Sequence, residues 1–238
     1  MKHNSRSRRR WKKLLWHIHV PALMDNRGVL LPTRHATLAP AIRKEIYFGD
    51  YEAKEADIVV QRLSQDDVVM EVGAGIGYLS ALCAKRIGNQ RVFAYEANPA
   101  MMAVIALTHQ ANGVAPTVKN TLLAEGDGER TFHLADEFWA SSLVAPAAGA
   151  RTITVPQTDL NSELALVRPT FLIVDIEGGE IEFFQVARLD GVQKICLETH
   201  PGVLTNAEIS GLLARLIGAG FAIDFSLLRK NVFYLYRP

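Results

Sequence analysis

Cysteine is scarce in this 238-residue chain, and neither of its two cysteines sits in a pattern that binds metal or forms a bridge. Cys83 falls in a predicted helix and Cys196 in an apolar predicted strand. Such cysteines pack as small hydrophobic side chains, so we predict no disulfide. Because no C-x-x-C pair or similar ligand spacing occurs, the sequence also predicts no metal site of that kind.

Long apolar runs and internal repeats are missing as well. No run approaches the roughly 20 residues of a membrane span. With 49% hydrophobic and 21% charged residues, the chain is long enough for one well-packed α/β domain with a modest extension. We therefore expect a soluble, cytoplasmic protein.

Charge is unevenly distributed. Seven of the 26 basic residues lie in positions 1–13, which hold no acid, so 19 bases face 25 acids in the remainder. Trp11, Leu14, Leu15 and Ile18 would form an apolar stripe on a helix beside these bases. One interpretation is a solvated tail that leads into a helix packed on the domain. The other is peripheral membrane contact through residues 1–18, or contact with an anionic partner.

The segment 68–80 predicts a nucleotide-type site. Its apolar start indicates a strand buried on both faces, Gly73, Gly75 and Gly77 allow a sharp turn, and a helix follows. The N–H groups at such a helix start face the ligand. A nicotinamide dinucleotide fingerprint needs a further glycine where Tyr78 stands. The acid-first spacing Glu71-x-Gly-x-Gly-x-Gly is instead similar to motif I of class I S-adenosylmethionine (SAM) methyltransferases.

Glu96 ends the next predicted strand, 91–96, and lies 19 residues after Gly77. A carboxylate at this strand tip can accept hydrogen bonds from both ribose hydroxyls of an adenosine. Asn98 and Pro99 then read as the N-cap and first residue of a helix. We therefore predict that Glu96 holds the cofactor ribose.

The regions flanking these motifs predict the site's surroundings. Residues 25–50 look irregular, with one short helix at 41–46, and should form a lid or flank. After a third strand at 116–123, extra strands at 130–134 and 152–155 enclose a loop with Trp139, Ser141 and Ser142. This loop either shapes the acceptor pocket or covers the sheet edge, and a short helix at 158–166 follows.

Acidic side chains gather where two later strands end. The apolar strand 171–174 leads into Asp175 and Glu177, and the strand from 195 brings Glu198 and His200 to the same edge. Ligands of open α/β sheets bind at this edge. We predict Asp175 as general base, His200 as second choice, and Glu198 and Glu177 as orienting groups. A divalent metal held by these acids is a lower-ranked alternative.

Together these motifs resemble the FkbM family of SAM-dependent methyltransferases over roughly residues 49–200. They are Gly49-x-Tyr51-Glu52, Glu71-Val-Gly-Ala-Gly-Ile-Gly77, Tyr95-Glu96-Ala97-Asn98-Pro99, Val174-Asp-Ile-Glu-Gly-Gly-Glu180 and Leu197-Glu-Thr-His200. Glu71 departs from the frequent Asp, and Gly75 from the frequent Asn. The predicted cofactor-binding residues are Tyr51, Glu52, Glu71, Gly73, Ala74, Gly75, Gly77, Glu96, Ala97 and Asn98.

The resemblance implies a Rossmann-like, doubly wound sheet of seven strands in the order 3-2-1-4-5-7-6, with the last strand antiparallel and an N-terminal helical extension. It divides the chain into a basic arm with a flanking or lid segment, 1–48, and a methyltransferase domain, 49–238. It implies O-methylation of a small molecule, sugar or lipid-linked glycan.

Three other classes remain as alternatives. One is a non-catalytic SAM-binding protein, which could dispense with the strand-end acids. Another is a nicotinamide-dependent oxidoreductase, which Tyr78 disfavours. A nucleic-acid amine methyltransferase is disfavoured because Asp175-Ile-Glu-Gly stands in place of an Asn/Asp-Pro-Pro-aromatic motif.

Overall fold

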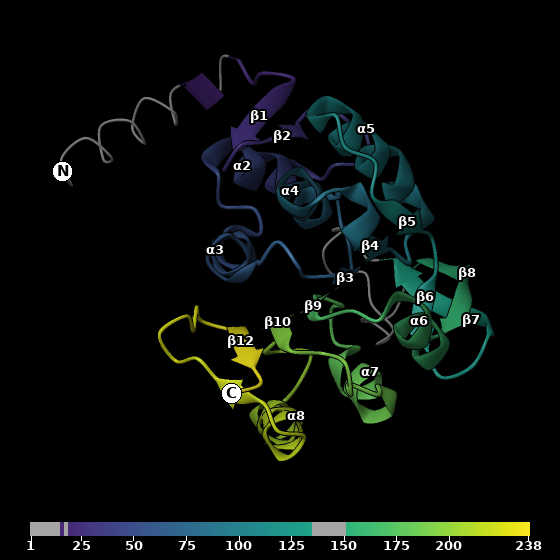
Figure 1. The fold of residues 1–238 in the computed structure, drawn as a ribbon. Coiled ribbons are helices and arrows are strands. Elements are labelled where there is room, and N and C mark those ends of the chain that lie inside the picture. The colour runs from purple at the N-terminus through teal and green to yellow at the C-terminus, as the bar shows by residue number, and fades with distance from the viewer. Residues whose placement is uncertain (1–14, 17–18, 135–150) are drawn as a thin grey trace.

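The computed structural model describes residues 15–16, 19–134 and 151–238, and its centre is a seven-stranded sheet (Figure 1). The spatial order is β11-β12-β10-β9-β3-β4-β5. The strands are β3 (Val69–Val72), β4 (Val92–Tyr95), β5 (Thr117–Lys119), β9 (Phe171–Val174), β10 (Lys194–Glu198), β11 (Ala222–Ile223) and β12 (Val232–Tyr236). β12 runs antiparallel to both neighbours, whereas the pairs from β10 to β5 are parallel. Numbered along the chain and read from β5, the order is 3-2-1-4-5-7-6, so the predicted topology is confirmed.

Helices cover both faces of this sheet, and side-chain alternation along the strands explains why. In β9, Phe171 and Ile173 belong to one core cluster and Leu172 and Val174 to the other. The first cluster includes residues of α3 (Ala53–Arg62), α4 (Tyr78–Ile87) and α5 (Met102–Asn112). The second includes residues of α6 (Leu160–Val167), α7 (Glu180–Val186) and α8 (Asn206–Gly218). A strand with apolar side chains on both faces is therefore buried on both faces.

The segment predicted to be irregular with one short helix also contains a hairpin, which the sequence analysis did not predict. β1 (Leu23–Asn26) pairs antiparallel with β2 (Val29–Pro32). The two turn residues, Arg27 and Gly28, both have positive φ, +53° and +83°, which is the geometry of a tight hairpin turn. The predicted short helix is longer than expected: α2 (Pro40–Phe48) begins at Pro40, because proline suits the first helical turn.

The predicted third strand is wrong in extent, because the chain changes sheets within it. After β5, β6 (Leu122–Ala124) joins a separate three-stranded sheet with β7 (Gly128–Leu134) and β8 (Arg151–Asp159). At the break, the Asn120 amide donates to the carbonyl oxygens of Glu96, at 2.7 Å, and Ala97, at 3.2 Å. The extra strands are confirmed but are longer than predicted. Because β8 extends to Asp159, the following helix, α6, begins at Leu160.

Two predicted features fall outside the described residues: the basic arm at 1–13 and the loop of Trp139, Ser141 and Ser142. The 3-10 turns η1 (Asn89–Arg91) and η2 (Pro99–Met101) complete the elements used below. Cys83 and Cys196 are free and buried. Within the described part of the chain, no helix has both the length and the apolar character needed to cross a membrane.

Candidate active site

The turn after β3 is held against the ends of β4 and β9. The N–H groups of Gly73 and Ala74 donate to the Tyr95 carbonyl oxygen, at 2.9 and 3.1 Å. Gly73 has φ +87°, and a Cβ at this position would lie 1.7 Å from the Asp175 carbonyl oxygen. Only glycine fits, because the position combines a left-handed backbone with direct backbone contact. The glycine therefore brings the turn against the residue that follows β9.

The next glycine makes room for two predicted cofactor residues. A Cβ at Gly75 would lie 2.7 Å from the Tyr51 hydroxyl and 3.2 Å from Glu52 Oε1. Glu52 itself has φ +43° and precedes α3, so an unusual backbone conformation presents its side chain to the turn. Burial raises the pKa of the Glu52 carboxyl well above its ordinary value, and the charge of Glu71 adds to this increase.

Glu96 joins the glycine turn to the tip of β4. Its Oε2 accepts from the Gly75 N–H and its Oε1 from the Asn98 N–H, both at 2.8 Å. Burial raises the pKa of Glu96 to about 7, although these backbone hydrogen bonds lower it. Each carboxylate oxygen has a second acceptor position, so two ribose hydroxyls can be held without breaking the existing bonds.

A cavity of about 420 Å³ opens at the carboxyl ends of β3, β4, β9 and β10. One part of its wall is formed by Gly75 and Glu96 and another by Asp175, Glu177 and Glu198. The predicted cofactor residues on this wall are Tyr51, Glu52, Gly73, Gly75, Glu96, Ala97 and Asn98. A cofactor at the glycine turn and an acceptor at the acids would therefore share one cavity.

Three predicted cofactor residues, Glu71, Ala74 and Gly77, are not on the cavity wall. Glu71 lies within β3, only 1% exposed, and burial raises its pKa to about 8. Gly77 takes a left-handed conformation at the start of α4, where a Cβ would lie 3.0 Å from His109 Nε2. These three residues therefore shape the glycine turn without lining the cavity.

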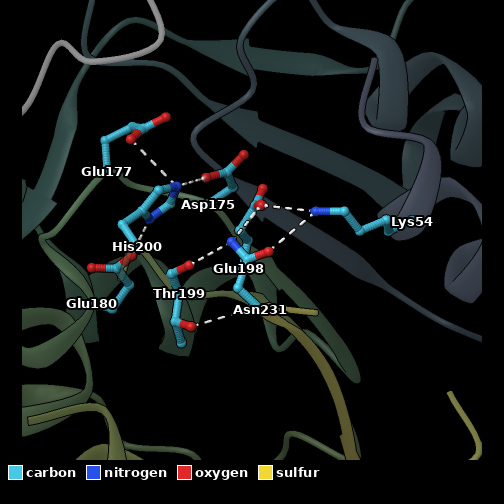
Figure 2. A network of polar contacts seen from close by, with 8 residues as sticks. All are labelled: Lys54, Asp175, Glu177, Glu180, Glu198, Thr199, His200 and Asn231. Atoms are coloured by element: carbon cyan, nitrogen blue, oxygen red, sulfur yellow. Dashed lines mark hydrogen bonds and ion pairs between the residues drawn. The ribbon is translucent and has the colours of Figure 1, made fainter. Parts of the chain in front are cut away.

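Two of the predicted catalytic residues, Asp175 and Glu177, lie beside the imidazole of a third, His200 (Figure 2). His200 Nε2 lies 3.3 Å from Asp175 Oδ1 and 3.3 Å from Glu177 Oε2. On the opposite side of the ring, Nδ1 lies 2.5 Å from Glu180 Oε1. Glu180 is fully buried at the start of α7, so it holds the ring in a fixed orientation.

This environment changes what His200 can do. Burial lowers the pKa of His200, but the neighbouring carboxylates of Asp175 and Glu180 outweigh it and raise the pKa to about 11. An imidazolium has no free lone pair at neutral pH. The arrangement therefore favours an orienting, charge-balancing role for His200 over that of second-choice base.

Glu198 has two partners that the sequence does not reveal. Lys54 Nζ lies 3.4 Å from Glu198 Oε1, and the Asn231 amide donates to the same oxygen at 2.9 Å. Lys54 also donates to Asn231 Oδ1 at 3.2 Å, which closes a small network (Figure 2). Neither residue lies in a recognisable motif. One available signal was the place of Lys54 beside the motif residues Tyr51 and Glu52.

Comparisons with known proteins point to methyltransferases. A model of the TRM5/TYW2 methyltransferase domain matches residues 41–136, which include the glycine turn and Glu96. The hexuronic acid methyltransferase AglP of Haloferax volcanii is 26% identical over 172 residues, covering 67% of this chain and 70% of that protein.

Solved methyltransferase structures are also similar in part. Magnesium protoporphyrin IX methyltransferase (ChlM) from Synechocystis PCC 6803, solved with bound SAM, has a TM-score of 0.47 and 14% identity, with 87% of this chain and 88% of that chain covered. The precorrin-6y C5,15-methyltransferase of Geobacter metallireducens GS-15 has a TM-score of 0.48 and 15% identity, with 92% and 100% covered.

The family model and the observed topology agree on the coarse assignment. The sheet order is that predicted for class I methyltransferases, and the matched segment contains the residues predicted to hold SAM. These comparisons do not show the more specific assignment to the FkbM family. These findings support a SAM-dependent methyltransferase with a class I, Rossmann-like fold.

Proposed function

We propose that this protein transfers the methyl group of SAM to a hydroxyl group of a sugar or glycan acceptor, as the resemblance to the FkbM family implies. The observation that carries the proposal is the position of Asp175. Its Oδ1 is buried without a hydrogen bond, and the residue shares a cavity wall with Gly75 and Glu96. An acceptor in this cavity would lie between the cofactor site and a carboxylate able to take its proton.

The chain's own residues account for the steps of transfer. SAM supplies a methyl group on a sulfonium, and the departing product is a neutral thioether. Glu96 and the glycine turn would hold the cofactor ribose and so position SAM in the cavity. Asp175 accepts the acceptor's hydroxyl proton as the new carbon–oxygen bond forms and the carbon–sulfur bond breaks. Most of the acceleration comes from alignment, because in-line displacement depends on close positioning of the two reactants.

The charge of the cavity supports a sugar over a polyanionic acceptor. Among the described residues, nine acidic side chains and two lysines line it. Proteins that bind nucleic acid use lysine and arginine to neutralise phosphates, whereas the charged side chains on this cavity wall are mostly acidic. The similarity to a hexuronic acid methyltransferase favours a sugar acceptor on independent grounds.

A labelled-SAM transfer screen tests the proposal. Cell extract would be divided into glycan, lipid-linked glycan and RNA fractions, incubated with the protein and labelled SAM, and labelled products identified by mass spectrometry. We expect label on a glycan hydroxyl. Label confined to RNA, or no transfer to any fraction despite SAM binding, would contradict the proposed acceptor class.

Asp175→Asn tests the role of the strand-end acid. The variant keeps size but loses basicity, so turnover should fall by about 10²- to 10⁴-fold with SAM affinity nearly unchanged. Asp57→Asn is the control, because Asp57 is exposed and pairs with Arg27 away from the cavity. Near-normal single-turnover methylation by Asp175→Asn would rule out the assignment.

A further inference from the structure

The strand-end cluster holds more carboxyl groups than basic groups among the described side chains around it. Four carboxylates, from Asp175, Glu177, Glu180 and Glu198, surround His200 or adjoin it. The one lysine paired with them is Lys54, which contacts Glu198. Carboxylates removed from water are costly unless they are paired or coordinate a metal.

The contact between His200 and Asp175 does not have hydrogen-bond geometry. Nε2 and Oδ1 are 3.3 Å apart, yet Oδ1 makes no hydrogen bond. Two ligand atoms each about 2.1 Å from one ion, at angles between octahedral and tetrahedral, lie about 3.0–3.4 Å apart. The observed separation falls within this range. One ligand atom each from Asp175, Glu198 and His200 lie within 4.8 Å of one another.

The support of His200 fits metal coordination as well. Glu180 Oε1 accepts from Nδ1, which leaves Nε2 directed at Asp175 and Glu177 (Figure 2). A histidine that binds metal through one ring nitrogen commonly donates the other N–H to a carboxylate. The fully buried Glu180 would thus fix the ring for coordination by Nε2. A cation bound there would displace the proton that Nε2 carries in the metal-free protein.

A second, independent observation is a buried acid on the same wall. Glu55 is 2% exposed, its Oε1 has no hydrogen-bond partner, and it lines the cavity together with Asp175 and Glu198. An unsatisfied buried carboxylate oxygen costs about 1–3 kcal/mol or more. A cation in the cavity would offset this cost.

We propose that Asp175, Glu198 and His200 bind one divalent transition-metal cation, such as Mn²⁺ or Zn²⁺, with Glu180 orienting the histidine. The imidazole ligand favours Zn²⁺ over Mg²⁺ and Ca²⁺, and the two carboxylates also suit Mn²⁺. The role of the cation rests on the proposed function: it would hold the acceptor oxygen and make its hydroxyl easier to deprotonate, assisting Asp175. The binding itself does not depend on that function.

Mn²⁺ binding to the full chain, stripped with chelator and free of SAM and acceptor, tests the site. Electron paramagnetic resonance of free Mn²⁺ gives the affinity, and Zn²⁺ competition gives the second ion. We expect one saturable site. Glu180→Gln should weaken binding about 10- to 100-fold, as expected for a residue that orients a ligand, and Asp175→Asn and Glu198→Gln should weaken it at least as much.

Glu182→Gln is the matched control, since Glu182 lines the same cavity but pairs with Arg130. It should leave affinity nearly unchanged. Circular dichroism checks that each variant folds. Because three substitutions are tested, the site can still be judged if one of these variants does not fold. Absence of saturable Mn²⁺ or Zn²⁺ binding in the wild type would overturn the site, as would equal weakening by Glu182→Gln and Asp175→Asn. Because SAM is absent from this experiment, its outcome does not test whether the protein transfers methyl groups.

Discussion

At Gly73 the backbone of the glycine turn meets the backbone after β9, and no side chain fits between them. An alanine Cβ would lie 1.7 Å from the Asp175 carbonyl oxygen, and the φ of +87° is itself unfavourable for alanine. We predict that Gly73→Ala lowers the free energy of unfolding by more than about 3 kcal/mol, because backbone must move. Urea denaturation measures the loss.

Gly126→Ala separates the clash from the backbone strain. Gly126 has a similar φ, +77°, but a Cβ there would have no atom within 4 Å. Its cost should be about 1–2 kcal/mol, the strain alone. Equal losses in the two variants would show that the close approach at Gly73 is not what makes glycine necessary.

Glu96 should make SAM binding depend on pH. Burial raises its pKa to about 7, so the ligand-free carboxyl takes up a proton as pH falls through 7. The ribose hydroxyls need the charged form as acceptor, so SAM affinity should fall with decreasing pH, by up to about tenfold per unit below 7. Calorimetry between pH 6 and 8 measures this dependence.

Glu96→Gln is the comparison for that measurement. It cannot lose a proton, so its weaker affinity should lack the part of the pH dependence that Glu96 contributes. The sign is opposite for stability: a carboxyl whose pKa is raised on folding stabilises the ligand-free protein below about pH 4.5, and that contribution is lost as pH rises through 7. Identical pH profiles of SAM binding in wild type and variant would contradict the ribose assignment.

Among the elements, the β1–β2 hairpin depends on a side chain from a distant helix. Asn112 at the end of α5 donates to the Leu30 carbonyl oxygen at 2.8 Å and accepts from the Leu30 N–H at 2.9 Å. Its amide thus replaces a neighbouring strand at one residue of β2. We predict that Asn112→Ala destabilises the protein by about 1–3 kcal/mol and speeds hydrogen exchange at Leu30. Asn112→Asp keeps the acceptor but loses the donor, so its loss of stability and its exchange rate at Leu30 should be intermediate. Unchanged hydrogen exchange at Leu30 in both variants would contradict the bridging role of Asn112.

Elements with strong local signals were predictable from the sequence. The apolar strand before Asp175 and the helical segment that starts after Asn98 are both present. The hairpin was missed although Gly28 marked its turn, because each strand has only four residues and does not alternate clearly. The change of sheet after β5 was missed because it depends on tertiary hydrogen bonds of Asn120.

At the scale of the whole molecule, the sheet topology explains why the site could be placed but not completed from sequence. Parallel strands bring Glu96 and Asp175 to one edge, and each follows an apolar strand, so both were identifiable. The partners of Glu198 come from α3 and the residue before β12, Lys54 and Asn231, which are separated from it by 144 and 33 positions. No short spacing records such contacts.

The central claim is that the cavity between the glycine turn and the strand-end acids binds SAM. Isothermal titration of SAM and NADH against the full chain, with Glu96→Ala in parallel, tests it most directly. We predict that SAM binds at one site, that NADH does not, and that Glu96→Ala weakens SAM binding by about 1.5–3 kcal/mol, roughly 10- to 150-fold. Binding of NADH in preference to SAM, or SAM affinity unaffected by Glu96→Ala, would contradict the account.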